Sequence, residues 1–62
     1  MYNHEITKLI NENLRLDSRA ITLILEFYKT QDKELLEQVE QIQKQILHNR
    51  EKIVTIGGDP LW

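Results

Sequence analysis

Two histidine and glutamate pairs are the residues best suited to acid–base chemistry. Glu5 follows His4 directly, and Glu51 lies three residues after His48. An imidazole that is oriented by a carboxylate can transfer protons near neutral pH. Group transfer also needs an activated nucleophile, yet Ser18 is the only serine and the chain contains no cysteine. We therefore expect that the protein is not an enzyme.

Metal and cofactor binding are not expected either. The two histidines lie at opposite ends of the chain with no thiol beside them, so a structural zinc site has too few ligands. Gly57 and Gly58 are followed by Asp59, but the lysine and the helix of a phosphate-binding loop are missing. We expect that the protein binds no cofactor.

Lys8, Arg15 and Arg19 form the candidate nucleic-acid surface of this chain. They share one predicted helix, and Arg15 and Arg19 lie one turn apart, so they can contact neighbouring phosphates. The whole chain, however, has ten acidic and eight basic residues and a net charge of −2. This balance predicts neither nucleic acid nor a membrane as the main partner, so nucleic-acid binding is the alternative function.

Hydropathy predicts where the protein is found. No apolar run reaches the length of about 18 residues that a membrane-spanning helix needs. Asn3, His4, Glu5 and Lys8 interrupt the stretch in which a secretory signal would be continuously hydrophobic. We expect a cytoplasmic location and no membrane partner.

The elements that position these residues are predicted to be two helices. No glycine or proline occurs from residue 1 to residue 56, so none interrupts a helix there. A polar interval at 29–34 separates two apolar series, and Thr30 or Asp32 can cap the second helix. We place the helices at about 3–29 and about 32–56, which are long enough to cover each other as an antiparallel hairpin.

Two other divisions of the chain stay open at this stage. Asp17 can cap a helix while Leu16 packs on Ile21 as a hydrophobic staple, which would give three helices. The heptad spacing of the second half also extends back across the polar interval, which would give one helix over about 18–56. The mean helix length of about 12 residues argues against the single helix.

The strongest pattern in the sequence is an apolar spacing of four and three residues in the second predicted helix. Residues with this spacing form one seam along a helix, which predicts that the helix pairs with another. The predicted oligomer interface consists of Leu35, Val39, Ile42, Ile46, Asn49, Ile53 and Ile56.

Asn49 is the polar position of this seam. A buried asparagine can fix helix register and oligomeric state through a matching hydrogen bond, whereas an asparagine at a frayed helix end is hydrated. Asn13 occupies a comparable place between Leu9 and Leu16 of the first predicted helix. The two asparagines can therefore pair, either within one hairpin or between two.

The tail at 57–62 has a different composition from the rest of the chain. Gly57 can end the second helix in the left-handed conformation, and Pro60 prevents the helix from resuming. The tail then carries Leu61 and Trp62. Three interpretations of these side chains stay open: they fold back on the open end of the helix pair, they anchor the chain in a pocket of another protein, since tryptophan is enriched at binding hot spots, or the tail is disordered.

Together these elements predict an all-α protein in which residues 1–56 form an antiparallel helical hairpin and 57–62 a non-helical tail. A chain of 62 residues has a small core and gains from a second subunit, so we expect homodimers that form a four-helix bundle or coiled coil. In length and layout the hairpin resembles the plasmid copy-number regulators, whose dimers are four-helix bundles that bind RNA hairpins. No sequence motif is shared with them, so no family is assigned.

The expected function is that of a small regulator or inhibitor that binds an unidentified protein, as small phage or mobile-element proteins often do. It would act through helical apolar surfaces and through an anchor formed by Leu61 and Trp62. The first alternative is a dimeric RNA- or DNA-binding regulator that uses Lys8, Arg15 and Arg19. The second is a structural oligomerisation or scaffold subunit.

Overall fold

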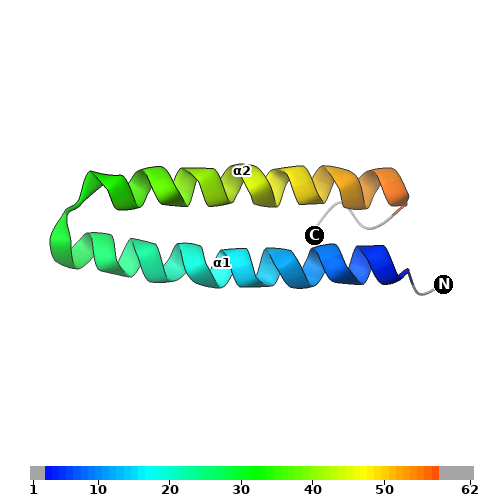
Figure 1. The fold of residues 1–62 in the computed structure, drawn as a ribbon, viewed down its shortest axis with the longest axis horizontal. Helices are drawn as coiled ribbons and strands as arrows, with labels where there is room; N and C mark the ends of the chain where they lie inside the picture. Colours follow the sequence, from blue (N-terminus) through cyan, green and yellow to red (C-terminus); the bar gives the residue numbers. More distant parts are fainter. Residues whose placement is uncertain (1–2, 58–62) are drawn as a thin grey trace.

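The computed structural model describes residues 3–57, which form two helices and the turn between them. Helix α1 runs over His4–Thr30 and helix α2 over Lys33–Ile56. The two helices lie side by side and antiparallel (Figure 1). The predicted all-α helical hairpin is therefore confirmed, and each helix begins and ends within one residue of the predicted ranges.

Both ends of α1 are closed by local hydrogen bonds. At its start, Oδ1 of Asn3 accepts from the backbone amides of Glu5 at 2.9 Å and Ile6 at 3.2 Å. At its end, Gln31 adopts the left-handed conformation with φ of 59°, and its amide donates to the Phe27 carbonyl at 2.7 Å. These bonds satisfy backbone groups that have no partner inside the helix.

Of the two residues that could cap α2, Asp32 does so. Its carboxylate accepts from the amide of Glu34 at 2.9 Å, whereas the Thr30 hydroxyl donates back to the Glu26 carbonyl at 3.1 Å. At the other end of α2, Gly57 has φ of 105°, which confirms its predicted role as the helix terminator.

Neither alternative division of the chain occurs. Helix α1 continues without a break through Asp17, so the hairpin has no third helix. The turn at Gln31 and Asp32 separates α1 from α2, so the two halves do not form one long helix. The caps at the turn explain the choice, because they supply the hydrogen bonds that a continuous helix would have made there.

The core lies between the two helices and is built from one stripe of each. Each stripe repeats with the spacing of four and three residues, and we call the two stripes together the interior seam. It consists of Leu9, Asn13, Leu16, Ala20, Leu23 and Phe27 from α1 and of Leu35, Val39, Ile42, Ile46, Asn49 and Ile53 from α2. All of these residues are buried or half-buried.

The register of the two helices is marked by a hydrogen bond across the seam. Nδ2 of Asn49 donates to Oδ1 of Asn13 at 2.9 Å. Counting from this pair in antiparallel helices brings Ile53 level with Leu9 and brings Ile42 level with Ala20. Ala20 and Ile42 belong to the same buried cluster, in agreement with this register.

Candidate protein interface

The predicted oligomer interface on α2 is occupied mainly by α1 of the same chain. Val39, Ile42, Asn49 and Ile53 are buried inside the hairpin, and Leu35 and Ile46 are partly buried against the same core. Ile56 alone is exposed, at 38%. A second chain must therefore bind to a different stripe of the helices.

A second stripe on each helix, the outer stripe, consists of the residues that directly follow the interior-seam positions, so it has the same spacing of four and three. On α1 its positions are Ile10, Leu14, Asp17, Ile21, Ile24 and Tyr28. On α2 they are Leu36, Glu40, Gln43, Leu47, Arg50 and Val54. Its large side chains reach water: Ile21 is 59% exposed, Tyr28 73% and Leu47 55%.

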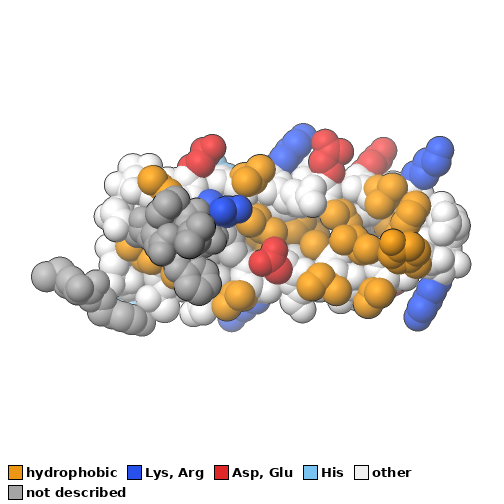
Figure 2. Space-filling model, turned by 180° about the vertical axis from the view of Figure 1, so that it is seen from behind, with side chains coloured by type: hydrophobic (Ala, Val, Ile, Leu, Met, Phe, Trp, Pro, Cys, Tyr) orange, Lys and Arg blue, Asp and Glu red, His pale blue; other side chains and the backbone are white. Residues whose placement is uncertain are grey.

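The two outer stripes lie on the same broad side of the hairpin. One residue along an α-helix turns the side chain by about 100° around the helix axis. Viewed down one axis, this turn is clockwise in one helix and anticlockwise in its antiparallel neighbour. The interior stripes of the two helices also point in opposite directions, because they face each other. The two differences cancel, so the residue that follows each seam position lies on the same side of the hairpin in both helices. In agreement, Figure 2 shows hydrophobic side chains over both helices on one face.

We call this side the apolar face. It is made of the exposed large hydrophobic residues on and beside the two outer stripes: Leu14, Ile21, Ile24, Leu25 and Tyr28 of α1 and Leu36, Leu47 and Val54 of α2. The face was not among the predicted site residues. Its signal is present in the sequence as a second spacing of four and three, shifted by one residue from the interior seam.

Among residues 3–57, the stripes on the opposite side of the hairpin carry no large apolar residue, and we call this side the polar face. It consists of the residues that precede each seam position: Lys8, Glu12, Arg15, Arg19, Thr22 and Glu26 on α1 and Glu34, Gln38, Gln41, Gln45, His48 and Lys52 on α2. All twelve are exposed. A face that is polar throughout is typical of a surface in contact with water, so the two sides have different roles.

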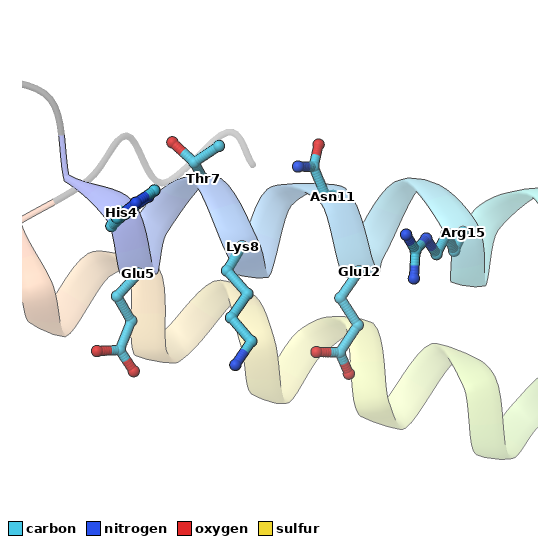
Figure 3. Close-up of a pocket in the computed structure, with 7 residues that line it drawn as sticks. All are labelled: His4, Glu5, Thr7, Lys8, Asn11, Glu12 and Arg15. Carbon is cyan, nitrogen blue, oxygen red and sulfur yellow. The ribbon is translucent and has the colours of Figure 1, made fainter.

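The three predicted nucleic-acid residues share the polar face. Lys8, Arg15 and Arg19 are exposed on one stripe of α1, so the structure does bring them together. Glu12 lies between them, and Figure 3 shows its side chain extending to the same side as that of Lys8. The shallow depression in this view is lined by α1 residues only and carries both signs of charge. Positive charge is therefore not concentrated as it is on a phosphate-binding surface.

The two histidine and glutamate pairs lie at the open end of the hairpin. Glu5, His48 and Glu51 line one depression at the open end of the hairpin. The nearby Thr55 hydroxyl donates to the Glu51 backbone carbonyl at 2.9 Å, a common contact of threonine within a helix. Within the same range, no group of three or more acidic, histidine or cysteine side chains could hold a metal ion.

Two further observations complete the description of the surface. Within residues 3–57, no helix combines the length and the apolarity that a membrane span requires. Leu61 and Trp62, the predicted partner anchor, lie outside the described residues.

The fold and the two faces together define a class of protein, an antiparallel helical hairpin with one apolar and one polar side. Comparison with known proteins finds no matching family model, no matching curated protein and no matching solved structure. The proposals below are therefore based on the geometry of this chain.

Proposed function

We propose that the protein is a small non-enzymatic regulator that acts by protein–protein association, and that its apolar face is the associating surface. The observation that supports this proposal is the exposure of large aliphatic and aromatic side chains along both helices on one side. Soluble monomers rarely leave a contiguous apolar patch of this kind in water.

The chemistry of the face favours a protein partner. Fully burying a Leu, Ile or Val side chain contributes about 1.5–3 kcal/mol, and a side chain that is half exposed has about half of this gain left. Leu25 at 58% and Leu47 at 55% exposure are typical of the face. Because the side chains recur every three or four residues, they match the grooves of another helical surface.

The test places a photoreactive benzoylphenylalanine at Leu25 on the apolar face of the intact chain. A matched probe at Gln38 on the polar face is the control, and both variants are irradiated in cells that produce the protein. We expect a covalent adduct with a protein chain from position 25 and none from position 38. Absence of a protein adduct at position 25, with circular dichroism showing that the helices are intact, would exclude the proposal.

A second candidate function, nucleic-acid binding, is supported by one observation: Lys8, Arg15 and Arg19 are exposed together on the polar face. Its test is the binding of an RNA hairpin and a DNA duplex to the parent and to a variant with both Arg15→Ala and Arg19→Ala. This function requires affinity that falls steeply with salt and that the double variant loses. Equal binding by both proteins would remove this function.

A further inference from the structure

We infer that the chain covering the apolar face is a second copy, related by a two-fold axis that crosses both helices at right angles. This inference rests on the proposed function, because it names the partner of the same face. Under this axis α1 packs antiparallel on α1 of the second copy, and α2 packs antiparallel on α2. The product is a four-helix bundle whose polar faces point outward.

The spacing of the outer stripes is the first argument for this axis. If it crosses α1 near Arg19 and α2 near Gln45, every outer-stripe position of one copy meets an outer-stripe position of the other. On α1 the pairs are Ile10 with Tyr28, Leu14 with Ile24 and Asp17 with Ile21. On α2 they are Leu36 with Val54, Glu40 with Arg50 and Gln43 with Leu47.

A single axis satisfies both helices, although α1 and α2 are independent stretches of sequence. In the register of the asparagine pair Ile10 is level with Lys52, so Val54, its outer-stripe counterpart on α2, lies two residues or about 3 Å further along the hairpin. The midpoints of the two stripes therefore lie within about 3 Å of each other along the hairpin. An isologous dimer requires this agreement, because each patch must be complementary to itself.

Charge complementarity is the second argument. The crossing axis sets Glu40 of each copy opposite Arg50 of the other, so two pairs of opposite charge flank the centre of the α2 contact. Glu40 is exposed and already has Lys44 as a neighbour, with Nζ 3.6 Å from Oε1. Its carboxylate can therefore accept a contact from the second copy while staying in contact with water.

The other possible two-fold axis runs lengthwise between the helices and sets α1 on α2 of the second copy. It would place Glu40 between Ile21 and Ile24, Arg50 between Ile10 and Leu14, and Asp17 between Gln43 and Leu47 of the second copy. Three charged groups would then lose water against aliphatic side chains without an opposite charge in return, which is unfavourable. The crossing axis leaves only Asp17 in such a contact.

The area of the face is sufficient for a dimer. Helix α2 has 24 residues and is about 36 Å long, and two packed helices are about 18 Å wide. One copy can therefore bury on the order of 650 Å² and a pair on the order of 1,300 Å², which is within the range of specific protein interfaces.

The first measurement is the mass of the full chain by light scattering over a concentration series. We expect a particle of twice 7.4 kDa and a melting temperature that rises with concentration. Ile21→Glu should weaken the dimer by about 100-fold or more, since it puts a charge next to the axis. Thr22→Glu, on the polar face, is the matched control and should change the dissociation constant by less than about threefold.

The second measurement tests the axis itself and does not depend on a destabilised variant. The chain contains no cysteine, so Ser18→Cys and Lys29→Cys each provide one site for a spin label, outside the outer stripe of α1. The crossing axis predicts about 10 Å between the two labels at position 18 and about 30 Å between those at position 29. The lengthwise axis predicts nearly equal distances at both positions.

The outcomes separate the inference from the proposed function. A chain that is monomeric at every concentration would exclude the second copy, as would equal label distances. If the probe at position 25 then forms an adduct with a different protein, the proposed function is retained while the inferred dimer is lost. A monomer without any protein adduct would exclude both.

Discussion

Asn49 donates a hydrogen bond to Asn13 from the other helix inside the hairpin, with 2.9 Å between Nδ2 and Oδ1. The exposed fractions of these two side chains are 1% and 5%. Oδ1 of Asn49 accepts from Gln45 at 3.1 Å, and Nδ2 of Asn13 donates to the Ile46 carbonyl at 3.4 Å. Because a heptad shift would set each amide against an aliphatic side chain, the pair specifies one register.

The Asn13 and Asn49 substitutions should be strongly non-additive. Asn49→Leu removes the donor to Oδ1 of the buried Asn13 and should lower the free energy of unfolding by about 1–3 kcal/mol. Adding Asn13→Leu replaces this buried amide by an apolar side chain, so the double variant should be more stable than either single variant. Urea unfolding of the four proteins measures the coupling, and additive effects would contradict the role of the pair.

Loss of the α2 cap should destabilise the hairpin. Asp32→Ala removes the acceptor for the Glu34 amide and should lower the free energy of unfolding by about 1 kcal/mol. Glu37→Ala, an exposed acidic position within α2, is the matched control and should change it by less than about 0.5 kcal/mol. Equal losses would mean that charge rather than capping is responsible.

The conformation of Gln31 makes it a site for stabilisation. Its φ of 59° costs a residue with a side chain about 1 kcal/mol, which glycine does not pay. Gln31→Gly should therefore raise the free energy of unfolding, by about 0.5 kcal/mol after the loss of the side-chain contacts to Phe27 and Tyr28. Gln38→Gly, inside α2, should lower it by about 1 kcal/mol.

Ile53 should be the most sensitive aliphatic position tested. It is 0% exposed, and Ile53→Ala should cost about 2–5 kcal/mol because it removes buried contacts and leaves a cavity. Ile56→Ala is the matched control, since Ile56 is 38% exposed and should lose less than half as much. Thermal and urea unfolding measure both, and a small effect at Ile53 would contradict its place in the core.

Asp17 should limit the strength of the inferred dimer. It is the charged position of the outer stripe on α1 and faces Ile21 of the second copy under the crossing axis. Asp17→Leu should tighten dimerisation by about tenfold. Glu26→Leu makes the same kind of change on the polar face and should leave the dissociation constant within about threefold. Dimerisation that Glu26→Leu strengthens equally would contradict the assigned face.

Much of the hairpin follows from the sequence because its signals are local. Asp32 and Gly57 act on backbone groups a few residues away, and the four and three spacing depends on the geometry of one helix. These features predicted both helices, the turn between them and the end of α2. The sequence also indicated that Asn13 and Asn49 could pair.

Only the tertiary structure decided which partner each stripe meets. On α1 two apolar spacings run side by side, shifted by one residue, and this helix by itself does not distinguish the seam that faces inward from the one that faces out. The short turn brings α1 onto the seam of α2, which places the asparagine pair inside one chain. The antiparallel direction then sets both outer stripes on the same side, because the apparent direction of the helical turn and the direction in which the seam faces are both opposite in α2.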